Sequence, residues 1–222
     1  MTVPGYRTKT QTLAVGGEDT IIRSLLDRQQ YADPTGAAER AGISSAAWPL
    51  FGLVWPSALV LASLMEHVVL GTRQVLEVGC GLALASLVVH RRDGTVTASD
   101  RHPLTEGFLS ENLRLNAMRP MAYCHGDWAA PNPALGRFDL IVGSDVLYEP
   151  DQPQQLASFI GRHARPAAQV IIVDPDRRNR MAFHRAMAAL GFEHAETKVH
   201  SLPGGHGVYK GRVLTYLRAA DR

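Results

Sequence analysis

Short apolar runs alternate with amphipathic stretches along the chain from residue 74 onward. The runs have the length of buried strands, and the stretches between them repeat with helical periodicity. This alternation predicts a parallel sheet with helices on both of its faces. The expected strands are 74–78, 95–99, 121–124, 138–143 and 169–173, and the expected helices are 82–90, 103–116, 153–164 and 180–190.

Two more strands are expected near the end of the chain, over 192–200 and 209–218. A short loop joins them, so they must run antiparallel, because a parallel pair needs a long crossover. Before the first strand, Pro56 opens an apolar stretch and suits the first turn of a helix. The predicted fold class is therefore α/β, with a seven-stranded and mostly parallel sheet that ends in an antiparallel hairpin.

The first part of the chain has no such regular pattern. Residues 10–15 are consistent with a strand, the Gly-Gly pair after them with a turn, and residues 21–26 with either a returning strand or a helix. Residues 31–45 are expected to lie on the surface. We therefore expect residues 1–45 to form a cap segment over a ligand site, and residues 46–222 to form the main domain.

Composition limits the partners and the compartment. The 222 residues are 45% hydrophobic and 20% charged, which is ordinary for one globular domain. A net charge of +2, from 23 basic and 21 acidic residues, is too small to indicate a nucleic-acid partner. Cys80 and Cys124 are expected to be free thiols in a reducing compartment. No secretory signal and no apolar run of membrane-spanning length is evident, so we expect a cytoplasmic protein without a membrane partner.

The turn after the first strand of the regular region carries the first candidate chemistry. Glu77, Gly79, Cys80 and Gly81 form an E-x-G-x-G motif that leads into a helix. Glycines at such a turn let backbone N–H groups approach a ligand at the helix N-terminus. A dinucleotide site would need a third glycine at position 84, which is leucine. An ordinary tight turn is the alternative, since Gly-x-Gly alone is a weak signal.

Three further segments follow strands that end at the same predicted edge of the sheet. Asp100 ends the second strand, where a carboxylate can accept hydrogen bonds from ribose hydroxyls, and this favours a nucleoside ligand. Asp127 and Trp128 follow the third strand, and in isolation they also suit an acidic turn with a packed aromatic. Asp145 and Tyr148 follow the fourth strand in the pattern D-x-x-Y.

This combination resembles the class I S-adenosylmethionine-dependent methyltransferases over residues 46–218. Those enzymes have a Rossmann-like seven-stranded sheet and bind the cofactor across the carboxyl ends of the first, second and fourth strands. With Trp-Pro at 55–56, Gly-Asp-Trp at 126–128 and D-x-x-Y, the chain is most similar to the D-x-x-Y protein lysine methyltransferases. The resemblance implies S-adenosylmethionine as cofactor, held by Trp55, Glu77, Gly79, Cys80, Gly81, Asp100, Arg101, Asp127, Trp128 and Ser144.

The resemblance also implies roles for the acceptor side of the site. Asp145 would orient the acceptor amine or the ammonium of the cofactor, and Tyr148 would shape the acceptor channel and form a hydrogen bond there. The implied activity is N-methylation of a lysine on a non-histone protein. The alternatives are a small-molecule or nucleic-acid methyltransferase, and a non-catalytic module that binds the cofactor. Trp55 also has a purely structural interpretation, as an aromatic core anchor.

Two remaining patterns are less specific. The loop 174–180 carries charges of both signs at the same sheet edge, which suits either docking of a protein substrate or an ordinary helix entry. His194, His200 and His206 are evenly spaced, but they lack i, i+4 spacing on a helix and a cysteine partner. No metal site is therefore expected.

Overall fold

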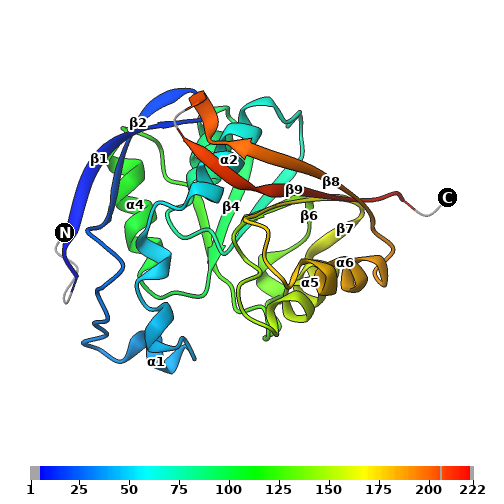
Figure 1. Ribbon diagram of the computed structural model, residues 1–222, viewed down its shortest axis with the longest axis horizontal. Coiled ribbons are helices and arrows are strands. Elements are labelled where there is room, and N and C mark those ends of the chain that lie inside the picture. Colours follow the sequence, from blue (N-terminus) through cyan, green and yellow to red (C-terminus); the bar gives the residue numbers. More distant parts are fainter. Residues whose placement is uncertain (1–5, 206, 221–222) are drawn as a thin grey trace.

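A seven-stranded sheet forms the centre of the computed structural model, which describes residues 6–205 and 207–220 (Figure 1). Its strands lie in the order β5-β4-β3-β6-β7-β9-β8. Neighbouring strands are parallel from β5 to β7, whereas β9 runs antiparallel to both β7 and β8. The predicted fold class is confirmed, including the terminal hairpin. The strands are β3 (Gln74–Val78), β4 (Thr95–Asp100), β5 (Ala122–His125), β6 (Phe138–Ser144), β7 (Ala164–Asp174), β8 (Glu193–Ser201) and β9 (Val208–Arg218).

Helices pack on both faces of the sheet, because successive side chains of a strand point to opposite faces. Val75 of β3 belongs to the core cluster that holds α2, α3 and α4, and Leu76 belongs to the cluster under α5 and α6. The helix expected over 82–90 begins two residues later, because Ala83 takes a left-handed φ of 58° at its N-cap. The helices are α1 (Ala37–Arg40), α2 (Pro56–His67), α3 (Leu84–Arg91), α4 (Thr105–Leu115), α5 (Gln152–His163) and α6 (Arg180–Ala188).

The N-terminal part folds as a separate hairpin of β1 (Thr8–Val15) and β2 (Glu18–Leu25). Of the two alternatives for 21–26, the strand is therefore correct. Asn112 of α4 and Asn116 at its C-cap fasten the hairpin, since their side-chain oxygens accept the backbone N–H groups of Arg23 and Ile21, each at 2.8 Å. Figure 1 shows the hairpin in blue beside α4. The hairpin thus lies against a helix of the main domain, and the chain after it leads towards the site described below.

The stretch Ser45–His67 corrects one expectation from the sequence. By length and composition it is apolar enough to cross a membrane, whereas the pattern along the chain predicts no such run. The structure divides it into two 3₁₀ turns, Ser45–Ala47 and Leu50–Gly52, followed by α2, which packs against α3 and the sheet. At about 1.5 Å per residue, the 12 residues of α2 reach about 18 Å, well short of the ~30 Å hydrocarbon core. This stretch therefore serves as a core element of the domain.

Candidate active site

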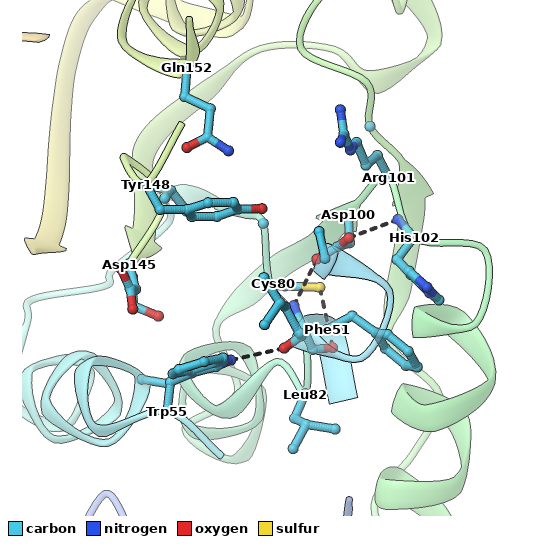
Figure 2. A pocket seen from close by; sticks show the side chains of 18 of the residues that line it. Phe51, Trp55, Cys80, Leu82, Asp100, Arg101, His102, Asp145, Tyr148 and Gln152 are labelled. Atoms are coloured by element: carbon cyan, nitrogen blue, oxygen red, sulfur yellow. Dashed lines mark hydrogen bonds between the residues drawn. The ribbon is translucent and has the colours of Figure 1, made fainter. Parts of the chain in front are cut away.

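An open cavity lies at the carboxyl ends of β3, β4 and β6, where open α/β sheets bind ligands. Its two ends differ in chemistry. Figure 2 shows Asp100, Arg101 and His102 at one end, and Asp145 between Tyr148 and Trp55 at the other. The loops after β3, β4, β5 and β6 form most of the wall, and residues 43–58 close the remaining side. The topology thus gathers residues that are far apart in the sequence.

The turn after β3 brings backbone close to the cavity because it has no side chains at two positions. Gly79 and Gly81 have positive φ angles of 56° and 52°. A Cβ on Gly81 would lie 2.8 Å from the carbonyl oxygen of Phe51, and one on Gly79 would lie 2.9 Å from the side chain of Val146. Any other residue would therefore be strained and crowded at either position.

Asp100 connects the end of β4 to this turn. One carboxylate oxygen accepts the backbone N–H of Gly81 at 2.9 Å, and the other accepts that of His102 at 2.8 Å. Burial raises the pKa of Asp100, although these backbone hydrogen bonds oppose the effect. The carboxylate lines the cavity, and its remaining lone pairs can accept ligand hydroxyls there.

Glu77 differs from its predicted role. It does not line the cavity and is only 2% exposed. One carboxylate oxygen accepts both the backbone N–H of Ser86, at 2.7 Å, and its hydroxyl, at 2.5 Å. Glu77 therefore fastens α3 to β3 beneath the glycine turn. Burial raises its pKa to about 7.

The variant Glu77→Gln is expected to remove a pH dependence of stability. Between about pH 4.5 and 7, folded wild-type protein keeps a proton on Glu77 that the unfolded chain has lost. The free energy of unfolding therefore falls by about 3 kcal/mol as the pH rises through this window. Glutamine cannot ionise, and its amide oxygen still accepts from Ser86. Urea unfolding across this pH range should show a decline that is about 3 kcal/mol larger in wild type than in the variant, since the raised pKa of Asp100 affects both proteins equally. Equal slopes in both proteins would contradict the prediction.

The end of the cavity opposite Asp100 is built on a left-handed residue. Asp145 has a φ of 53°, and its backbone N–H donates to the carbonyl of Val173 at 2.8 Å. Its carboxylate is held by the side chain of Arg177, with Nε at 2.9 Å from one oxygen and Nη2 at 3.0 Å from the other. The ring of Tyr148 extends over the cavity, and burial raises its pKa.

The aromatic residues predicted for the site line the cavity and also have structural contacts. The indole N–H of Trp55 donates to the carbonyl of Leu50 at 2.8 Å, which fixes the ring near Asp145. Trp128 packs where a Cβ on Gly79 would meet its ring at 3.4 Å. The neighbouring Asp127 accepts the backbone N–H of Ala129 at 3.0 Å, as expected for an acidic turn. The structural and the ligand-binding interpretations are thus compatible here.

All predicted site residues except Glu77 line this one cavity. They are Trp55, Gly79, Cys80, Gly81, Asp100, Arg101, Asp127, Trp128, Ser144, Asp145 and Tyr148.

Sequence reasoning missed several contributors. The sequence pattern marks Arg177 only as part of a charged loop, although the pairing of β6 with β7 places that loop beside D-x-x-Y. His102 stacks on Phe51 with 3.8 Å between ring centroids, and both line the cavity. Burial lowers the pKa of His102 to about 4. Gln152 and Gln155 of α5 also line the wall, and no motif marked them.

The N-terminal segment expected to form a cap reaches the cavity at one residue. Among residues 6–45, Ile43 lines it. No group of three His, Cys, Asp or Glu side chains that could hold a metal ion occurs within the described part of the chain. His206, one of the three evenly spaced histidines, lies outside the described residues.

Comparison with known proteins agrees with this architecture. The structure is similar to magnesium protoporphyrin IX methyltransferase from Synechocystis PCC 6803 with bound SAM (TM-score 0.60, 17% identity, 74% of this chain and 80% of that chain). It is also similar to a ribosomal protein L11 methylase from Lactobacillus delbrueckii subsp. bulgaricus (0.60, 20%, 73% and 78%). A third similar structure is the 16S rRNA N2 G1207 methyltransferase of T. thermophilus in complex with AdoMet and guanosine (0.64, 19%, 99% and 52%). A search of curated proteins gave no significant match.

Fold and cavity together define a class I S-adenosylmethionine-dependent methyltransferase. A family model described as lysine methyltransferase matches residues 47–188, which is more than half of the chain. The chain therefore belongs to the lysine methyltransferase family. The cavity fits S-adenosylmethionine, because Gly79 and Gly81 line it without side chains and Asp100 offers a carboxylate to hydroxyls.

Proposed function

We propose that this enzyme methylates the side-chain amine of a lysine on a non-histone protein. The observation that carries the proposal is the position of Asp145 and Tyr148 at the end of the cavity opposite Asp100 (Figure 2). A ligand whose sugar is held by Asp100 would extend its reactive centre towards them. Membership of the lysine methyltransferase family supports the same acceptor.

The chemistry requires alignment more than a strong base. When bound, S-adenosylmethionine supplies a methyl group on a sulfonium sulfur, which keeps the carbon–sulfur electron pair as an amine lone pair forms the new bond. A lysine ammonium, with a reference pKa of ~10.4, has no lone pair and must first release its proton to solvent. Asp145 can then accept a hydrogen bond from the amine, while Trp55 and Tyr148 flank the acceptor and exclude water. Such positioning supplies most of the rate in reactions of this kind.

The alternative acceptors receive less support. The similar structures include enzymes named for a small molecule, a protein and an RNA, so the fold alone does not choose among them. A net charge of +2 disfavours nucleic acid, since binding many phosphates needs a basic surface. Cys80 and Cys124 are both free in the described structure, which supports a further proposal that the protein works in a reducing compartment such as the cytoplasm.

The proposal can be tested by incubating the enzyme with radiolabelled S-adenosylmethionine and an extract of the cells in which the protein naturally occurs. The expected result is a discrete labelled protein band, with methyl-lysine in its digest by mass spectrometry. An extract treated with nuclease controls for RNA, and a dialysed extract controls for small molecules. Label that enters only RNA or a dialysable compound would show that the acceptor is not lysine.

A further inference from the structure

The carboxylate of Asp145 already has a cationic partner in the structure without an acceptor. Arg177 forms a bidentate pair with it, in which each carboxylate oxygen accepts one N–H of the guanidinium. The side chain of Asp145 lines the cavity and is 12% exposed, whereas that of Arg177 does not line the cavity and is 40% exposed, so the guanidinium is partly in solvent. Each carboxylate oxygen keeps a free lone pair. The ion pair of Asp145 and Arg177 as a whole has no net charge.

The position of Arg177 is fixed from both sides of the loop after β7. Asp174, which is fully buried at the end of that strand, accepts the backbone N–H of Arg177 at 2.6 Å. The side-chain amide of Asn179 donates to the carbonyls of Leu147 and Glu149, both at 2.9 Å. The loop is therefore tied to the D-x-x-Y segment itself, and the guanidinium is preorganised at Asp145.

A bare carboxylate at this position would oppose the reaction. An anion beside an amine stabilises the ammonium form and raises the pKa of the amine. The ammonium form binds well and cannot attack, so ground-state binding would increase while the reactive fraction fell. A neutralised carboxylate can still orient the amine by a hydrogen bond without that electrostatic cost.

Given the function proposed above, we propose that Arg177 neutralises Asp145 so that the acceptor lysine is held as its free, reactive amine. Arg177 is thus a positioning residue that acts through Asp145. The D-x-x-Y motif contains the carboxylate but not its counter-charge. In this structure Arg177, from the neighbouring loop, supplies that counter-charge.

Other ionisable groups packed around Asp145 do not replace this cation. Asp174 at the end of β7 is a second acid, and burial raises its pKa. Tyr209 of β9 lies near both carboxylates, with its hydroxyl 2.8 Å from that of Ser57, and burial raises its pKa to about 12. Tyr148 carries no charge at neutral pH, because a phenol has an ordinary pKa of ~10 and burial raises that of Tyr148 further. Arg180, a second cation near Asp174, is paired with Asp176 and Glu196. Without Arg177, the two carboxylates Asp145 and Asp174 would therefore lack a dedicated counter-charge.

The variant Arg177→Gln tests this role against Arg178→Gln, which removes the same charge from an exposed neighbour in the same loop. The substrate is a synthetic peptide that contains the lysine found by the labelling experiment. The pH dependence of kcat reports groups in the enzyme–substrate complex, here the bound amine. For Arg177→Gln we expect the midpoint of the pH dependence of kcat to move up by about one pH unit. This is near the lower end of the pKa shifts that one neighbouring charge causes, because Arg177 is partly exposed and solvent screens its charge.

Below that midpoint, a shift of this size lowers kcat about tenfold. KM should fall at the same time, since the ammonium form is bound more tightly. Arg178→Gln should match wild type in both quantities. Arg177→Lys keeps the charge and should retain the wild-type midpoint even if kcat is lower. Titration with S-adenosylhomocysteine should give unchanged cofactor-site affinity in all four proteins.

A wild-type midpoint in Arg177→Gln, or an equal shift in Arg177→Lys, would overturn the inference and leave lysine methylation intact. A wild-type enzyme that methylates no lysine would overturn both proposals. If Arg177→Gln does not fold, Arg177→Met takes its place with the same expected shift, because it also removes the charge and keeps a long side chain.

Discussion

Asp145→Asn is expected to lower the rate of methyl transfer about a hundredfold or more, with little change in affinity for the cofactor. Asparagine tolerates a left-handed φ of 53° and nearly matches the shape of aspartate, so the turn after β6 should be preserved. One carboxylate oxygen becomes an N–H₂ group, however, and the bidentate pair with Arg177 is lost. The guanidinium is then left unpaired beside the cavity, where it would repel the ammonium of the proposed lysine acceptor.

Two assays separate this effect from a general defect. Calorimetric titration with S-adenosylhomocysteine should give a dissociation constant close to that of wild type, and transfer of radiolabel to the acceptor should be nearly absent. Asp151→Asn is a matched control for the chemical change. Asp151 is an exposed acid shortly after the D-x-x-Y motif and does not line the cavity. Retention of more than about a tenth of wild-type transfer by Asp145→Asn would show that the carboxylate does not position the acceptor.

Most of the site could be predicted because parallel strands place their carboxyl ends together. Asp100 and Asp145 each follow an apolar run of strand length, and neighbouring parallel strands end at one edge of the sheet. Their proximity therefore follows from strand order, without any knowledge of side-chain packing. The glycine turn is predictable for a similar reason, since a positive φ and a close carbonyl leave few residues possible.

The direction in which the side chain of Glu77 points could be predicted from the strand pattern. Side chains alternate along a strand, so Glu77 shares a face with Val75, which packs in the cluster that contains α3. That face leads to Ser86 and away from the cavity. The motif suggested a ligand contact, whereas the strand period correctly indicates a contact with the helix.

Other features of the site depend on tertiary packing that local patterns do not encode. The pair between Arg177 and Asp145 requires two loops to meet with particular side-chain rotamers. The stack of His102 on Phe51 joins the end of β4 to a 3₁₀ turn that the sequence did not indicate. That turn also breaks the apolar stretch 45–67, which composition alone does not distinguish from a membrane span.

Asp100→Asn is expected to weaken binding of S-adenosylhomocysteine about a hundredfold, which corresponds to one charged hydrogen bond of the stronger kind. Both carboxylate oxygens accept backbone N–H groups, from Gly81 and His102. In the variant, an amide N–H₂ must face one of those donors, and the ligand hydroxyls lose an anionic acceptor. The glycine turn should loosen as well, because its N–H is one of the two groups held.

The pH dependence of binding separates this role from simple loss of structure. Burial raises the pKa of Asp100, so its carboxylate takes up a proton at a higher pH than an ordinary aspartate as the solution is acidified. Wild-type affinity should therefore decline on acidification through that pKa, whereas Asp100→Asn should show no such decline. Asp93→Asn is the control for the same chemical change, because Asp93 is an exposed acid just before the start of β4 and does not line the cavity. Wild-type affinity in Asp100→Asn would mean that the sugar is held elsewhere, and the account of how the cavity orients its cofactor would then have to be replaced.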